Sequence, residues 1–224
     1  MKAENQPSRL ADAAQLDDET VVRRVLAGEV ALFELIIRRY NQRLFRVTRS
    51  VLKDDAEAED AMQDAYIDAF GKLATFRGEA KLSTWLTRIA LYEALGRLKK
   101  RRGGMSIIDD EESIMADESQ RSPERDAFSG ELRVLLERAV DALPAGLRAA
   151  YVLRDVEAMS TAEAAACLDI GEDALKMRLS RARSLLRARL SAELGSAAAD
   201  LFGFQAPRCD RMVAVVMAAI ARRP

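Results

Sequence analysis

Six cationic side chains follow one another between Asp173 and Glu193 with no carboxylate among them. They are Lys176, Arg178, Arg181, Arg183, Arg187 and Arg189. Like charges at helical spacing repel each other, and a polyanion such as DNA relieves that repulsion. Upstream, Ser160 and Glu163 have the spacing of a capping box, which marks where a preceding helix begins. The two features together predict a DNA-binding helix-turn-helix over residues 160–183.

The residues of the predicted turn fit this interpretation. Leu168 and Ile170 are the apolar residues that would pack the two helices together, and Asp169 tolerates a left-handed conformation better than most residues. The alternative is a solvated amphipathic helix at the end of a bundle, which is what a run of charge usually is. A helix cap, a tight turn and a helix whose charged side chains are all cationic occur together here, and this combination favours DNA binding.

The composition excludes several other kinds of site. The chain has 224 residues, a net charge of −1, no histidine and two cysteines, Cys167 and Cys209. It therefore has no histidine chemistry, and the cysteine count excludes a disulfide framework and a zinc cluster. We expect Cys167 to be a small core residue, and Cys209 stays unassigned. No cofactor is predicted, and no enzymatic constellation is visible.

The charge and hydropathy of the chain also limit which kinds of partner it can bind. A net charge near zero means that any DNA affinity must come from local basic patches. The polar N-terminus and the lack of a long apolar run predict no signal peptide and no membrane insertion. We therefore expect a cytoplasmic protein.

Apolar residues recur at helical spacing along most of the chain. They do so over residues 21–26, 33–51, 58–73 and 82–90, with Asp17 or Asp18 and Ser83 as expected N-caps. Gly103-Gly104 then interrupts the pattern, and an acidic stretch follows that includes Asp109, Asp110, Glu111 and Glu112. Helical periodicity returns near Glu131, and Pro144 fits the start of a further helix.

The chain is therefore predicted to be all-α, with two helical domains joined by a flexible acidic linker. We expect the N-terminal domain over residues 17–102, the linker over 103–128 and the C-terminal domain over 129–190. The second domain contains the helix-turn-helix. A tail over residues 191–224 has no assigned role.

This order of motifs resembles the extracytoplasmic-function (ECF) group of bacterial RNA polymerase sigma factors. The segment from Ala58 to Tyr66, AEDAMQDAY, is similar to the family's polymerase-binding helix. Phe76-Arg77-Gly78-Glu79 and STWLTRIA from Ser83 to Ala90 are similar to its promoter-melting segment. LKMRLSRAR from Leu175 to Arg183 resembles its recognition helix. The resemblance covers about Asp17 to Leu190.

The resemblance implies a docking face for polymerase. Residues of the acidic segment would bind the clamp coiled coil of the largest polymerase subunit: Glu59, Asp60, Gln63 and Asp64. Carboxylates and an amide are suitable partners for arginines there. Without the resemblance, the same residues would be interpreted as a solvated helix face.

The resemblance also implies two DNA-binding surfaces. The surface for the downstream promoter element combines aromatic rings, on which bases can stack, with cations that can bind phosphate. Its residues are Phe76, Trp85, Arg88, Tyr92, Arg97, Lys99 and Lys100. Core packing is at least as good an interpretation of Trp85, whereas Phe76 in the preceding loop is freer to meet a base. Tyr92 stands where the family commonly has asparagine, which leaves the preferred base open.

For the upstream element, Lys176, Met177, Ser180 and Arg181 match positions directed into the major groove. Arg178 and Arg183 would lie off that face and hold phosphate or a partner surface. In the linker, Asp109 to Glu112 would act as a phosphate mimic in the polymerase channels, or else as a simple tether.

We therefore expect a transcription-initiation sigma factor, without catalytic activity of its own, that binds core RNA polymerase and promoter DNA. An anti-sigma factor is a further expected partner. The alternative is a helix-turn-helix regulator whose N-terminal block senses a signal or dimerises. The acidic face from Glu59 to Asp64 and the aromatic-basic segment from Phe76 to Arg102 count against it, because a regulator needs neither.

Overall fold

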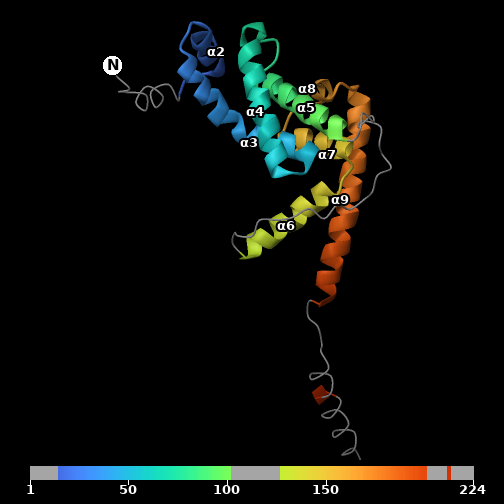
Figure 1. Ribbon diagram of the computed structural model, residues 1–224. Helices are drawn as coiled ribbons and strands as arrows, with labels where there is room; N and C mark the ends of the chain where they lie inside the picture. The colour runs from blue at the N-terminus through green and yellow to red at the C-terminus, as the bar shows by residue number, and fades with distance from the viewer. Residues whose placement is uncertain (1–14, 102–126, 201–210, 213–224) are drawn as a thin grey trace, which may run out of the picture. The chain divides into compact units, whose positions relative to one another are not determined.

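A computed structural model describes residues 15–101, 127–200 and 211–212 of the chain, and every regular element among them is helical (Figure 1). The all-α prediction is thereby confirmed. The described residues up to Leu186 form one compact unit, and those from Arg187 onward form another. The predicted acidic linker lies almost entirely outside the described residues, as does most of the tail.

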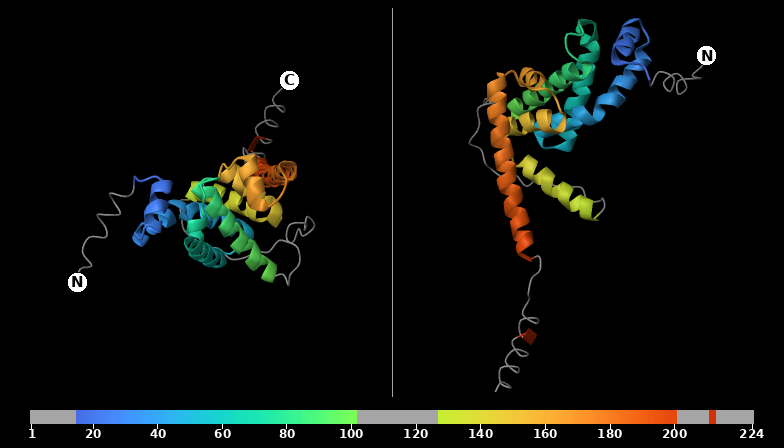
Figure 2. Two further views of the ribbon diagram at one scale, coloured as in Figure 1. Left: turned by 90° about the horizontal axis from the view of Figure 1, so that it is seen from above. Right: turned by 180° about the vertical axis from the view of Figure 1, so that it is seen from behind.

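The N-terminal block contains the helices α2 (Asp18–Leu26), α3 (Phe33–Leu52), α4 (Asp55–Lys72) and α5 (Leu82–Arg101). Two short 3-10 helices, η1 (Val30–Leu32) and η2 (Leu73–Thr75), join them. The three long helices pack on one another, and α2 closes one end of the block against α3 (Figure 2). The apolar stripes predicted from periodicity meet in this core, where Ile36, Leu44 and Leu86 are buried.

The helix starts follow from local hydrogen bonding. The Asp17 carboxylate accepts a hydrogen bond from the Thr20 amide at 2.7 Å, so the predicted cap of α2 is confirmed. The prediction of Ser83 as an N-cap is wrong. The Lys81 carbonyl already accepts from the amides of Thr84 and Trp85, so α5 begins at Leu82 and Ser83 lies inside its first turn.

The C-terminal block contains α6 (Ala127–Asp141), α7 (Ala145–Tyr151), a π-helical turn η3 (Val152–Val156), α8 (Thr161–Leu168) and α9 (Glu172–Asp200). Pro144 directly precedes α7, as its fixed φ favours. Helix α9 continues past residue 190 to Asp200, so the first part of the predicted tail is helical.

One apolar core joins the two blocks. It contains Val47 and Val51 of α3, Leu91 and Leu98 of α5, and residues of the C-terminal block that include Leu153, Cys167 and Leu175. The views agree that α7 lies beside α3 and that α8 lies beside α5 (Figures 1 and 2). The prediction that Cys167 is a core residue is confirmed, because it is buried in this cluster.

Candidate functional site

The helix-turn-helix has the predicted cap and turn. The amide of Glu163 donates to the Ser160 hydroxyl at 3.1 Å, and the Ser160 amide donates to the Glu163 carboxylate at 2.9 Å. These bonds from Ser160 hold the pKa of Glu163 below its usual range. Asp169 ends α8 in the left-handed conformation, with φ of 55° and ψ of 44°. The predicted capping box and left-handed turn residue are therefore confirmed.

Helix α9 begins with a buried stripe and an exposed face. Leu175, Leu179, Ala182 and Leu186 are buried at helical spacing. The residues predicted to face the major groove are exposed instead: Lys176, Met177, Ser180 and Arg181. Met177 is the clearest case, because 69% of this apolar residue is accessible on an otherwise polar face. The structure thus brings these predicted residues together on the side of α9 opposite its core contacts.

The other two arginines of this helix have different surroundings. Arg183 donates to both carboxylate oxygens of Asp155, at 2.8 and 2.6 Å, in the bidentate geometry that guanidinium groups favour. This contact lowers the pKa of Asp155 and ties α9 to the turn η3. Arg178 is half-buried. Arg183 therefore differs from Lys176, Ser180 and Arg181 by its contact with Asp155, and Arg178 differs from them by its lower exposure.

The acidic face of α4 is exposed as predicted. Glu59, Asp60, Gln63 and Asp64 are all accessible to solvent, while Ala58, Ala61 and Ala65 of the same helix are buried. A groove of about 280 Å³ adjoins this face between α3 and α4. It is lined by Asn41, Gln42, Phe45, Glu59, Met62 and Gln63. Three of these residues lie on α3, and sequence reasoning missed them because nothing local marks them.

Part of the acidic face is neutralised from within the chain. Arg97 of α5 forms an ion pair with Asp64 and lies 3.9 Å from the Asp60 carboxylate. Arg101, one turn later, pairs with Glu57 at 3.1 Å. Arg97 was predicted to hold DNA phosphate, and in this structure its guanidinium contacts the predicted polymerase face instead. Arg97 and Asp64 are 33 positions apart in the sequence, so only the packing of α5 on α4 reveals their contact.

The residues predicted to bind the downstream promoter element differ in their exposure to solvent. Phe76 and Trp85 are half-buried and pack on each other, with ring centroids 5.4 Å apart. Phe76 is therefore no freer than Trp85, contrary to expectation, because the chain after η2 folds its ring back onto α5. Arg88 and Tyr92 are exposed one turn apart, and the Arg88 guanidinium lies 5.6 Å from the centre of the Tyr92 ring. Lys99 and Lys100 are exposed in the last turn of α5.

The described residues contain neither a candidate metal site nor a candidate membrane-spanning helix. No cluster of three or more histidine, cysteine, aspartate or glutamate side chains is arranged there to hold a metal ion. None of the helices in this part of the chain is both long enough and apolar enough to span a membrane.

Both blocks match models of known protein families. Residues 36–103 match the model of Sigma-70 region 2, and residues 133–186 match that of Sigma-70, region 4. The first match covers α4 and α5, and the second contains the helix-turn-helix. A regulator with an unrelated N-terminal sensing domain does not fit this pair of matches.

Curated relatives and solved structures agree with these matches. The ECF RNA polymerase sigma-E factor of Escherichia coli is 34% identical over 180 residues, which cover 77% of this chain and 93% of that protein. The RNA polymerase sigma-H factor of Pseudomonas aeruginosa is 30% identical over 179 residues, with the same coverage of 77% and 93%.

The fold is shared with two solved structures of lower identity. One is the sigma factor RpoE of Bartonella quintana, solved in complex with the anti-sigma factor NepR, with a TM-score of 0.58, 23% identity and coverage of 71% of this chain and 96% of that one. The other is CnrH, solved with the cytosolic domain of CnrY, with a TM-score of 0.57, 24% identity and coverage of 78% and 97%. The matches to regions 2 and 4, together with the 34% identity to the ECF sigma-E factor of Escherichia coli, show that the chain belongs to the ECF group of sigma factors, which direct RNA polymerase to promoters.

Proposed function

We propose that this sigma factor works through three separate surfaces. The acidic face of α4 binds core RNA polymerase, α5 and the loop before it bind the downstream promoter element, and the start of α9 binds the upstream element. The observation that carries the proposal is the exposure of Glu59, Asp60, Gln63 and Asp64 on one helix beside a groove. In this scheme residues 17–102 and 129–190 are the two working domains, and residues 103–128 link them.

The α4 face suits a basic partner helix. Arginine side chains of the partner would form charge-assisted hydrogen bonds with Glu59 and Asp60. Phe45 and Met62 in the adjacent groove offer apolar surface to the aliphatic part of such a side chain. Arg97 and Arg101 already occupy Asp64 and Glu57, so a partner arginine has to compete with them there.

The DNA surfaces combine cations with a few apolar or aromatic groups. On α9, Lys176 and Arg181 would donate to guanine edges, and the exposed Met177 would contact a thymine methyl. On α5, the Tyr92 ring beside Arg88 offers a stacking face next to a phosphate-binding group. Lys99 and Lys100 extend the positive charge toward the end of the helix. Phe76 and Trp85 would reach a base only through their exposed edges.

The remaining properties follow from this role. The protein would have no catalytic activity of its own and would act in the cytoplasm, where polymerase is found. The sigma factor RpoE of Bartonella quintana, which has a similar fold, was solved in complex with the anti-sigma factor NepR. We propose that this chain also has an anti-sigma partner. The acidic residues Asp109 to Glu112 would enter the polymerase channels as a phosphate mimic.

The docking face is tested by changing Asp60→Arg together with Gln63→Ala. These residues are exposed, so the helicity of the chain should be unchanged. The variant loses the carboxylate of Asp60 and the amide of Gln63, and it places a new cation opposite the arginines of the polymerase. We therefore expect it to lose binding to core polymerase. A pull-down with core enzyme and run-off transcription measure the effect.

A matched control changes Glu19→Arg together with Gln15→Ala. Both residues are exposed and lie outside the region 2 match, and the change in charge is the same. The control should bind core polymerase like wild type. Equal binding by the test variant and the control would remove the basis for the docking assignment.

A further inference from the structure

Two arginines of α5 lie against the acidic face of α4. Arg97 donates to the carboxylate of Asp64, and one of its nitrogens lies 3.9 Å from the carboxylate of Asp60. Arg101, one turn later on α5, pairs with Glu57 at 3.1 Å. Three carboxylates on this side of α4 therefore already have cationic partners from the same chain.

The packing of α5 on α4 fixes these arginines in place. Ala61 of α4 and Ala94 of α5 are buried in the same apolar cluster, and so is Leu98. Alanine side chains end at Cβ, so they allow the two helices to approach closely. Arg97 directly precedes Leu98 at the edge of this contact, and its side chain reaches across to the α4 carboxylates.

The acidic face is thereby divided lengthwise into two halves. Glu57, Asp60 and Asp64 lie on the side of α4 that meets α5, as their contacts with its arginines show. Glu59 and Gln63 lie toward α3, where they line the groove of about 280 Å³. Among the described residues, no cation pairs with Glu59. A basic partner thus meets one open carboxylate beside the groove and three that are already paired.

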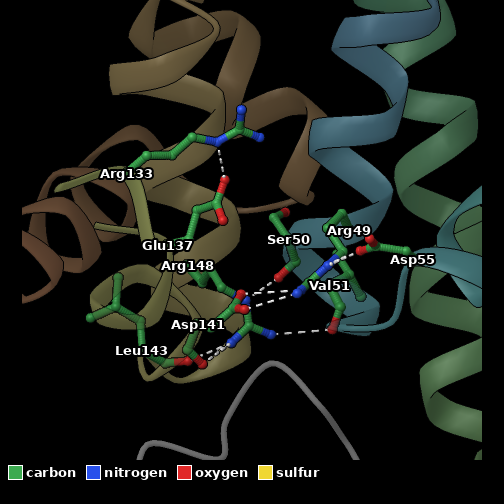
Figure 3. Close-up of polar contacts among 9 residues, drawn as sticks. All are labelled: Arg49, Ser50, Val51, Asp55, Arg133, Glu137, Asp141, Leu143 and Arg148. Carbon is green, nitrogen blue, oxygen red and sulfur yellow. Dashed lines mark hydrogen bonds and ion pairs between the residues drawn. The ribbon is translucent and has the colours of Figure 1, made fainter. Parts of the chain in front are cut away.

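The pairs on the α5 side are exposed, so a partner's arginine can replace Arg97. The Asp64 side chain is 53% exposed and that of Arg97 is 31% exposed. Figure 3 shows a buried arginine for comparison: Arg148 is 1% exposed and donates to the backbone carbonyls of Ser50 and Val51. Exposed ion pairs are weak, whereas removing the partner of a buried charge is costly. Arg97 therefore competes for Asp64 without excluding a partner from it.

This competition lowers the affinity for a basic partner in two ways. When a partner's arginine replaces Arg97 at Asp64, one ion pair forms and one is lost, so the net gain is small. The displaced guanidinium also stays close to the incoming one, and like charges repel each other. Neither cost arises at Glu59.

We infer that Arg97 and Arg101 limit the affinity of this sigma factor for core RNA polymerase, because they occupy carboxylates that a basic segment of the polymerase would otherwise bind. The inference rests on the proposed function, since it assumes that the acidic face of α4 is the docking surface. It gives Arg97 a role at this surface, through Asp60 and Asp64, that is independent of DNA.

The test variant is Arg97→Gln with Arg101→Gln. The measurement is the displacement of a labelled wild-type chain from core polymerase in the absence of DNA. Both side chains are partly exposed, so the fold should be unchanged. We expect the test variant to bind about fivefold more tightly than wild type, as two exposed ion pairs of ordinary strength predict. The gain should shrink as the salt concentration rises, because it comes from charge pairs at the surface.

Two further variants show whether the gain comes from the freed carboxylates. Arg97→Lys with Arg101→Lys keeps both cations and should bind like wild type. Adding Asp64→Asn and Glu57→Gln to the test variant removes the two carboxylates as well, so the gain should disappear. A gain that persists in this fourfold variant would overturn the inference.

The control is Arg24→Gln with Arg133→Gln, which changes the net charge equally and breaks two exposed pairs in which α4 takes no part. It should bind like wild type. An equal gain in the control would assign the effect to net charge alone, and an unchanged or lower affinity of the test variant would show that the two arginines do not compete. Either result overturns the inference.

The docking assignment is judged separately by Asp60→Arg with Gln63→Ala. If that variant loses binding while the test variant gains none, the acidic face still docks on polymerase and only the competition is refuted. If it binds like wild type, the docking assignment and the inference are both wrong.

Discussion

Two threonines one turn apart on α5 have opposite hydrogen-bonding environments. Thr84 donates to Glu163 across the contact between the blocks, whereas the buried Thr87 hydroxyl has no partner among the described residues. Valine has nearly the shape of threonine and lacks the hydroxyl. The pair therefore separates the effect of a satisfied buried hydroxyl from that of an unsatisfied one.

Thr87→Val should raise the free energy of unfolding by about 1 kcal/mol, because it removes a desolvated group that gains no hydrogen bond. Thr84→Val should lower it by a similar amount, because the substitution removes a donor to Glu163. Each change corresponds to a shift of about 2–4 °C in Tm for a protein of this size. Thermal denaturation followed by circular dichroism measures both. Shifts of the same sign in the two variants would contradict this account of the contact.

At the scale of single elements, α9 carries two arginines with separate roles in the proposed scheme. Arg181 lies on the exposed face with Lys176 and Met177, while Arg183 is held against Asp155. Two residues along a helix correspond to about a half-turn, so the two side chains point to different sides. The proposal assigns base recognition to the first and phosphate or partner binding to the second.

Arg181→Ala should cost roughly 1–3 kcal/mol of binding free energy and relax the preference at one upstream base pair. Arg183→Ala should weaken binding without changing the preferred sequence, because a phosphate contact carries no base information. A promoter library selected with each variant measures both effects. If both variants keep the wild-type preference at every upstream position, α9 is not placed in the groove as proposed.

The elements also show which features the sequence could predict. The capping box at Ser160 and the left-handed Asp169 depend on neighbouring residues, so their spacing was sufficient to predict them. Ser83 failed as a cap because the Lys81 carbonyl, two positions earlier, already accepts the first hydrogen bonds of α5. The Arg97–Asp64 pair and the α3 side of the groove depend on how distant helices pack, which no local pattern specifies.

At the scale of the whole molecule, the described parts of the two blocks form a single compact unit up to Leu186. The interruption at Gly103-Gly104 and the acidic stretch after it predicted two helical domains, and the chain matches region 2 before that interruption and region 4 after it. The sequence did not predict that they share one apolar core. That core depends on the second buried face of α5, where Leu91 and Leu98 lie, in addition to the face with Leu86.

Arg148→Met tests how strongly the blocks are coupled. Arg148 donates to carbonyls of Ser50 and Val51 on α3 and of Asp141 and Leu143 in its own block. Methionine fills similar space without donors, so buried carbonyls on both sides lose a charged partner. We expect the free energy of unfolding to fall by about 3 kcal/mol, as for other broken buried networks.

The same variant should also uncouple the two blocks. Trp85, the only tryptophan, reports the N-terminal block by fluorescence, while circular dichroism reports all helices. In the wild-type chain the two probes should give one coincident transition, and in Arg148→Met the transitions should separate. Arg133→Met is the control, because Arg133 pairs with Glu137 of the same helix and its side chain is 71% exposed, so this variant should unfold like wild type. If Arg148→Met is as stable as this control and its transitions coincide, the buried guanidinium does not join the blocks, and their cohesion has to come from the apolar core alone.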